Sequence, residues 1–191
     1  MKTFLREDGS VEHIVVFDSE NGKIVHKPRG QGYAEGTSWT RGQAWAIYGF
    51  SVAYMYTGKK EYLETALKVA DYFIENMKDS AVPPIDFKQP TEPYYIDTTA
   101  GMVAAAGMTI LKKYVEESAS ENLEKMICKL LDGAYENCNF DLEEDSILQN
   151  GSEKYHSEAG IHIPIIYGDY YLIETLMLRR GEKLTFVSEV I

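Results

Sequence analysis

The stretch that decides the fold is Gln31-Gly-Tyr-Ala-Glu-Gly-Thr-Ser-Trp-Thr-Arg-Gly-Gln-Ala-Trp-Ala-Ile-Tyr-Gly-Phe50, whose second half begins an apolar helix. It places Trp39, Arg41, Trp45 and two glutamines around one predicted helix start. Indole faces stack on sugar rings, and a guanidinium binds a carboxylate through two parallel hydrogen bonds. A helix start adds free backbone N–H groups and a positive dipole end. Together these groups suggest a site for an acidic sugar, although a tryptophan near a helix start is also common in a core.

Helical periodicity extends from this stretch to the C-terminal part of the chain. Three predicted helices, residues 39–56, 98–115 and 164–178, are rich in Gly, Ala, Tyr and Met and carry few charges. Two others, residues 61–77 and 121–135, have an apolar stripe and a charged face. Helices that are apolar on most sides are buried, and helices with one charged face cover them. The alternation predicts helical hairpins whose inner helices surround a centre. A simple bundle would account for the helices but not for their two compositions.

Two of the inner helices carry a stripe of small residues at helical spacing. Such a stripe permits the close approach of a neighbouring backbone. The two stripes consist of Gly42, Ala46, Gly49 and Ala53 in the first helix, and of Ala100, Ala104, Gly107 and Leu111 in the second.

The first 37 residues differ from the rest. Residues 11–17 are β-prone, and Asn21-Gly22 offers a two-residue turn before residues 23–25, which predicts a small hairpin. Alternation places Val11, His13, Val15 and Phe17 on one face of it. We expect residues 1–191 to form a single domain, with the hairpin and a loop over residues 1–37 and helical hairpins over residues 38–180.

Composition limits the possible partners. The formal net charge of −11 argues against nucleic acid and anionic membrane surfaces. Residues 21–58 are locally basic, because Lys23, Lys27, Arg29 and Arg41 outnumber the single acidic residue, Glu35. This excess suits an anionic small ligand or, equally, a solvated basic loop. No apolar run approaches the length of a membrane span, and no secretory signal is visible.

The two cysteines, Cys128 and Cys138, are ten residues apart. On one helix they would lie about 15 Å from each other, which is too far for a disulfide. Reduced thiols in a cytoplasmic protein are the simplest explanation.

Polar residues gather near the starts of the inner helices, which lie at one end of the fold if these helices are parallel. Asp97, before Thr-Thr-Ala, fits a helix N-cap, and Asp169 fits a buried hydrogen-bonding residue. His156 and His162 have no partners at metal-ligand spacing, so no metal site is expected. The acidic residues within 141–145 fit a solvated loop.

The chain resembles the unsaturated glucuronyl hydrolases of glycoside hydrolase family 88 along nearly its whole length. Related unsaturated rhamnogalacturonyl hydrolases usually have Arg-Gly-Asn-Gly-Trp in place of Arg41-Gly-Gln-Ala-Trp45, which favours family 88. The motifs that carry the resemblance are Leu5-Arg-Glu-Asp-Gly-Ser10, His13 with Phe17-Asp18, Gln31-Gly-Tyr33, the block from Ser38 to Phe50, Tyr56-Thr-Gly58, Ala70-Asp-Tyr-Phe73, Asp97-Thr-Thr-Ala100 and Tyr167-Gly-Asp-Tyr-Tyr171.

This resemblance implies a mainly α fold, a partial (α/α)6 toroid with a small N-terminal β-hairpin. It also implies a hydrolase that acts on unsaturated uronic acid oligosaccharides left by polysaccharide lyases. In this family an aspartic acid protonates C4 of the vinyl ether, water adds at C5, and the resulting hemiketal opens and releases the aglycone. The family needs no metal or organic cofactor.

The matching motifs assign roles to five residues. Arg41 would bind the uronate carboxylate, Trp39 and Trp45 would line the sugar subsite, and Gln31 would bind ring hydroxyls. His13, on the hairpin, would assist near the proton donor. The family's proton-donating aspartate and a second, assisting aspartate precede the hairpin. No residue of this chain matches them, and neither Asp97 nor Asp169 is assigned in their place.

Family members are about twice as long as this chain, and six inner helices close their ring, whereas three are predicted here. The chain therefore resembles the C-terminal half of such an enzyme. An open half-ring exposes apolar helix faces, so we expect self-association or pairing with the missing half. Three interpretations follow: an enzyme inactive without residues from outside this chain, a uronate-binding fragment, and a helical-repeat scaffold.

Overall fold

A computed structural model describes residues 3–182 of the chain. Within this range the chain forms five α-helices and one small β-hairpin, with short 3-10 helices at Lys112–Tyr114 and Glu158–Gly160. The fold is mainly α, as predicted. The elements are β1 (Val16–Phe17), β2 (Ile24–His26), α1 (Thr40–Thr57), α2 (Lys60–Met77), α3 (Thr98–Leu111), α4 (Glu117–Tyr135) and α5 (Ile166–Arg179).

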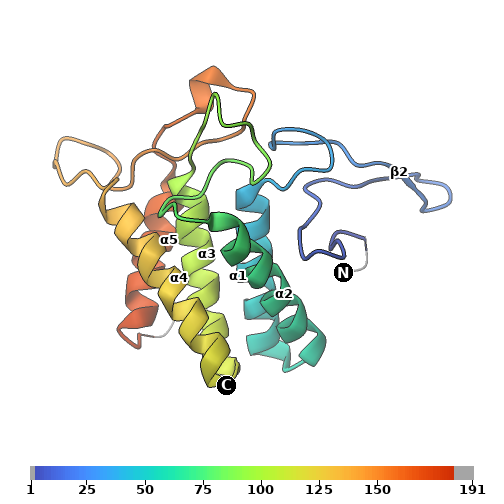
Figure 1. Ribbon diagram of the computed structural model, residues 1–191, viewed down its shortest axis with the longest axis horizontal. Helices are drawn as coiled ribbons and strands as arrows, with labels where there is room; N and C mark the ends of the chain where they lie inside the picture. The colour runs from blue at the N-terminus through green and yellow to red at the C-terminus, as the bar shows by residue number, and fades with distance from the viewer. Residues whose placement is uncertain (1–2, 183–191) are drawn as a thin grey trace.

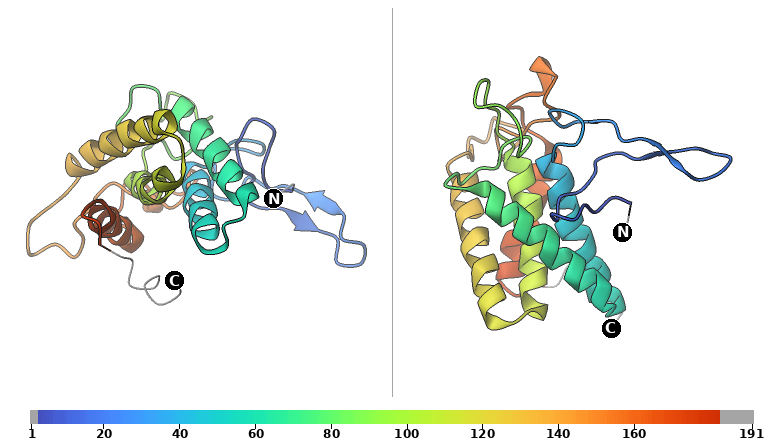
Figure 2. Two further views of the ribbon diagram at one scale, coloured as in Figure 1. Left: turned by 90° about the horizontal axis from the view of Figure 1, so that it is seen from below. Right: turned by 45° about the vertical axis from the view of Figure 1, so that its right-hand side comes forward.

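The helices form two layers, as their two compositions predicted. Helix α3 packs against both α1 and α5, while α2 covers α1 and α4 covers α3 (Figures 1 and 2). All residues of α3 are buried. The inner helices α1, α3 and α5 run in the same direction, so their N-termini meet at one end together with the longer loops (Figure 1). This common direction places three positive dipole ends beside those loops.

The two small-residue stripes differ in whether a neighbouring helix packs on them. On α3, a Cβ at Gly107 would lie 2.7 Å from the backbone nitrogen of Tyr48, so α3 and α1 approach closely there, as predicted. The stripe of α1 permits such an approach as well, but no neighbouring backbone among the described residues packs at Gly49. A Cβ at Gly49 would meet nothing within 4 Å. The stripe lines an open groove of about 280 Å³, formed by Trp45, Ala46, Gly49, Phe50, Ala53 and Tyr62.

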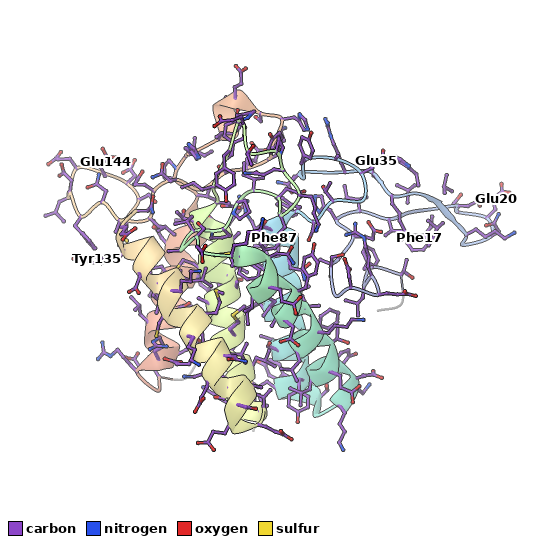
Figure 3. The ribbon with its side chains drawn as sticks, in the orientation of Figure 1. Phe17, Glu20, Glu35, Phe87, Tyr135 and Glu144 are labelled. Atoms are coloured by element: carbon purple, nitrogen blue, oxygen red, sulfur yellow. The ribbon has the colours of Figure 1, made fainter. Side chains whose placement is uncertain are left out.

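A second open face lies at the other end of the row of inner helices. A groove of about 390 Å³ runs between α4, the following loop and α5. Tyr135, labelled in Figure 3, is 72% exposed at its rim. The apolar side chains that line this groove are Leu131, Tyr135, Cys138, Phe140, Ile147, Leu172, Ile173 and Leu176. The described residues thus present two apolar grooves, one on α1 and one between α4 and α5.

The predicted hairpin exists, but it is short and exposed. Strands β1 and β2 pair antiparallel, and all five of their residues are exposed. The two-residue Asn21-Gly22 turn was wrong: the Asp18 backbone N–H donates to the Lys23 carbonyl, and the Asp18 carboxylate accepts from two loop amides. The prediction of a single alternating face over residues 11–17 was wrong too, because regular pairing covers only β1 in this range. The tip of the hairpin projects away from the helices (Figure 3).

Gln43 connects the segment before the hairpin to the helices. Its side chain is fully buried and makes three hydrogen bonds to the backbone. Its amide oxygen accepts from the Val11 N–H at 3.0 Å, and its amide nitrogen donates to the carbonyls of Gly9 and Val69. Gln43 of the quoted stretch therefore has a structural role, since it anchors the chain two residues before His13.

Glu144 belongs to an exposed acidic loop, as predicted (Figure 3). Cys128 and Cys138 are both free thiols, and Cys138 lies beyond the end of α4. No helix within residues 3–182 is both long and apolar enough to cross a membrane.

Candidate functional site

The site begins where the chain enters α1. Trp39 is the N-cap residue in an extended conformation, so the helix starts one residue later than predicted. The residues around it pair with an extended segment that precedes α3: Thr40 N–H donates to the Ile85 carbonyl, and Phe87 N–H donates to the Ser38 carbonyl. The indole packs over the first helical turn, where a Cβ at Gly42 would lie 2.9 Å from it. Glycine at this position lets the Trp39 ring cover the helix start.

Arg41 is the largest fully buried side chain, with 2% exposure. Its Nε donates to Oδ2 of Asp97 at 2.9 Å, and Nη2 donates to the Ser152 carbonyl. The guanidinium carbon lies 5.5 Å from the centroid of Trp39 and 5.8 Å from that of Tyr167. Nε and Nη2 are held by groups of the protein itself. The charge predicted to bind a ligand is thus already paired inside the protein.

Asp97 is the N-cap residue of α3, as predicted. Besides Arg41, it accepts a hydrogen bond from the Ser152 N–H at 3.2 Å. The carboxyl is fully buried, and burial raises its pKa while the Arg41 guanidinium opposes that rise. The Arg41–Asp97 pair joins the starts of α1 and α3 to the loop that contains Ser152.

His13 lies against Trp39, with ring centroids 4.3 Å apart and an interplanar angle of 47°. Its ring occupies the space above Gly30, where a Cβ would come within 1.8 Å of the imidazole. Burial lowers the pKa of His13, and a hydrogen bond with the Gln31 side chain partly offsets this. Gln31 also donates to the Glu153 carbonyl at 2.7 Å. His13, Gln31 and Trp39 therefore form one contiguous group.

Trp45, which follows Arg41 by one helical turn in α1, contacts two tyrosines of α5. Its ring centroid lies 6.2 Å from that of Tyr167 and 5.3 Å from that of Tyr171. Trp45 also packs against the apolar cluster that contains Trp39 and Tyr155, so both tryptophans lie on the same side of the molecule. The structure thus brings all five predicted residues into neighbouring positions at one end of the inner helices.

A pocket of about 360 Å³ lies beside this cluster, in the loops at the same end. Tyr155 connects the two, because its ring packs near Tyr33 and Tyr95 and also lines the pocket. The lining residues are Pro93, Tyr95, Tyr155, His156, Ser157, Glu158 and Ile161. Aromatic rings and hydroxyl groups together are suited to a sugar.

Half of the basic side chains in residues 21–58 form ion pairs. Lys27 forms an ion pair with Glu12 at 3.0 Å, and His26 lies 3.2 Å from Glu35. With Arg41 bound to Asp97, two of the four basic side chains have carboxylate partners. The charge excess is therefore a weaker indicator of an anionic ligand than the sequence suggested.

Asp169 is a buried hydrogen-bonding residue, as predicted. Its carboxylate accepts from Leu148 N–H, Ile147 N–H and Ser146 Oγ, and so fixes residues 146–148 to α5. His156 bonds to the Tyr33 carbonyl. Within residues 3–182 no group of three His, Cys, Asp or Glu side chains is placed to hold a metal ion.

Sequence reasoning missed Ser152, Tyr155 and the buried Asp86 as parts of the site. Ser152 meets Arg41 and Asp97 through its backbone, and a backbone group leaves no signal in the sequence. Tyr155 and Asp86 lie in loops without periodicity, so only the fold brings them to Trp39.

Known proteins resemble this chain both in sequence and in fold. No family model matches the chain. An unsaturated glucuronyl hydrolase from Bacillus sp. (strain GL1) is 36% identical over 93% of this chain and 48% of its own length. The crystal structure of that organism's enzyme, described as responsible for the degradation of glycosaminoglycan, has a TM-score of 0.82 at 33% identity, over 94% of this chain and 49% of the other.

A further solved structure shows a relative with a sugar bound. It is a variant of unsaturated glucuronyl hydrolase from Streptococcus agalactiae, complexed with dGlcA-GalNAc6S. Its TM-score is 0.81 at 28% identity, and the match covers 93% of this chain and 48% of the other. The chain therefore spans about half the length of the relatives that it matches.

Proposed function

This chain belongs to the unsaturated glucuronyl hydrolase family, and we propose that it binds the unsaturated uronic acid at the end of oligosaccharides left by polysaccharide lyases. We assign it to glycoside hydrolase family 88 as the half that holds the substrate. The observation that carries the proposal is the grouping of His13, Gln31, Trp39, Arg41 and Trp45 at one end of the inner helices.

Each residue supplies an interaction that such a sugar needs. Trp39 and Trp45 offer apolar ring faces. Arg41 keeps Nη1 for the uronate carboxylate, while Asp97 and Ser152 hold its other two nitrogens in place. A guanidinium fixed in this way loses little freedom when the carboxylate binds.

The reaction is the hydration of a vinyl ether. A proton adds to C4, positive charge develops at C5, water adds there, and the hemiketal opens to release the aglycone. The proton donor comes from outside this chain. His13 assists: with its pKa lowered by burial, the imidazole is neutral near pH 7 and is able to accept a hydrogen bond from the attacking water. The two free thiols support a cytoplasmic location.

An unsaturated disaccharide tests the binding role directly. We expect calorimetry to detect binding to the isolated chain, and Gln31→Ala to weaken it about fivefold, because one hydrogen-bonding group is lost. The matched control is Gln149→Ala, since Gln149 also donates one side-chain hydrogen bond of 2.7 Å to a carbonyl but lies outside the site. Equal affinities for the two variants would contradict the proposed site.

Catalysis is tested with the same disaccharide by following the absorbance of its vinyl ether. We expect no change with the isolated chain and a steady loss once the other half of the fold is supplied. Turnover by the isolated chain would show that the proton donor lies within it.

Two other functions remain alternatives. A uronate-binding fragment without catalysis would bind the disaccharide and never consume it, even beside the other half. A helical-repeat scaffold is favoured by one observation, the pairing of Arg41 with Asp97 inside the protein. For a scaffold, substitutions in the site would alter stability but not affinity.

The two apolar grooves at the ends of the half-ring support pairing with a second body of helices. We propose that helices from the part of the fold that this chain does not span pack on α1 and α5. Alone, the chain is then expected to self-associate and to bind dyes that report apolar surface. Sedimentation as a dye-negative monomer would contradict this prediction.

A further inference from the structure

Asp86 is a fully buried carboxylate that has no role in the function proposed above. It lies in the extended segment before α3 and accepts four hydrogen bonds. Oδ2 accepts from Tyr33 N–H at 3.0 Å and from Thr37 Oγ1 at 2.6 Å. Oδ1 accepts from Ser38 N–H at 3.3 Å and from Lys88 N–H at 2.9 Å. No ion pair to Asp86 is present among the described residues, so these donors alone compensate for its burial.

Three of the four donors belong to one loop, residues 33–38. The approach of this loop is close, because a Cβ at Gly32 would lie 2.7 Å from Oδ2 of Asp86. The loop and the Asp86 segment are also joined by backbone bonds that flank Trp39. The carboxylate therefore fixes the loop at its beginning, near Tyr33, and at its end, near Ser38.

The position of this loop decides the geometry of the sugar site. Gln31 precedes it by two residues, and Trp39 follows it directly. Both side chains lie at His13: a side-chain hydrogen bond with Gln31 raises the pKa of the imidazole, and the Trp39 ring packs against it with centroids 4.3 Å apart. A shift of the loop would move both partners of the imidazole away from their present places.

We propose that Asp86 is a positioning residue for the sugar site: it holds the loop of residues 33–38 so that Gln31 and Trp39 face His13. It does not touch the substrate. The inference rests on the proposed function for its effect on affinity, but its effect on the His13–Trp39 contact stands independently.

The test uses Asp86→Asn in the full chain, which keeps the size of the side chain and replaces one acceptor with an NH2 group that faces N–H and O–H donors. We expect the nuclear Overhauser effect between the His13 imidazole and the Trp39 indole to weaken, and the affinity for an unsaturated disaccharide to fall about tenfold, as for one or two lost hydrogen bonds. Thr37→Val removes the shortest hydrogen bond to Asp86, together with the bonds of the Thr37 hydroxyl to the Ala34 backbone, but keeps the Asp86 carboxylate. It should give a smaller change in the same direction, even if Asp86→Asn does not fold.

The matched control is Asp169→Asn. Asp169 is also a buried carboxylate that accepts two backbone amides and a hydroxyl, but from the loop of residues 146–148. We expect it to lower the melting temperature and to leave the His13–Trp39 contact and the affinity unchanged. An unchanged contact in both Asp86→Asn and Thr37→Val, or an equal loss in the control, would overturn the inference. If the wild-type chain bound no disaccharide, the proposed function would fail while the Overhauser measurement still decided the role of Asp86.

Discussion

Replacing Arg41 with methionine should destabilise the fold by about 3–5 kcal/mol, the usual cost of breaking a buried ion pair from one side. Methionine fills much of the same volume, so the loss is electrostatic rather than a cavity. Asp97, at 0% exposure, would keep its carboxylate without the guanidinium that now lies 2.9 Å away. The backbone N–H of Ser152 would remain as a donor to it. Urea denaturation followed by circular dichroism measures the change.

A double variant separates the charge from the fold. When Asp97→Leu is added to Arg41→Met, no buried charge is left, and most of the lost stability should return, because apolar replacements of a buried pair are often neutral. This double variant should fold and yet fail to bind an unsaturated disaccharide, since the guanidinium proposed to bind the uronate carboxylate is gone. A double variant as unstable as the single one would mean that the Arg41 side chain matters through packing and not through Asp97.

Arg41 thus has a structural role beside the proposed binding role, and the sequence pattern did not separate the two. The pattern Trp39-Thr-Arg41 placed a cation at a helix start, which fits a ligand site. The fold shows that the same cation joins α1, α3 and the loop at Ser152. A ligand site assembled from three segments needs such a connection, because each segment alone would move independently.

The helices could be predicted from the sequence because their periodicity is dense. Helix α3 is apolar on every side and is buried on every side. Helices α2 and α4 carry one charged face and lie outside. Gly58 ends α1 in the left-handed region, at φ +63°, as a glycine after a helix is expected to do.

The contacts of the loops could not be predicted in this way. Asp86 meets Tyr33 across 53 residues, and Arg41 meets Ser152 across 111 residues. Neither pairing has a period or a motif, because a backbone amide or carbonyl is the same group at every position. The hairpin turn failed for a related reason: Asp18 binds the loop amides itself and replaces the turn that Asn21-Gly22 would form.

The second large effect is expected at the contact between α1 and α3, where Gly107→Ala should cost about 3 kcal/mol, the upper part of the range for overpacking. The added Cβ would lie 2.7 Å from the nitrogen and 2.8 Å from the Cα of Tyr48. These are backbone atoms of α1, so no side chain is able to rotate away. The two helices would have to separate instead, and the packing of the Ile47 side chain against α3 at Gly107 would loosen. Thermal or urea unfolding of the variant measures this cost.

Gly49→Ala is the matched control, because the same change is made in the helix on the other side of this contact. Its Cβ would meet no atom within 4 Å. Alanine favours a helix over glycine by about 1 kcal/mol, so Gly49→Ala should be neutral or stabilising in the isolated chain. The control also reports on the open groove, since a helix seated closely on the α1 stripe would lose space to the new methyl group. Gly49→Ala should therefore weaken pairing with the rest of the fold while leaving the chain itself intact. Equal stabilities for Gly107→Ala and Gly49→Ala would contradict a close α1–α3 contact at Gly107.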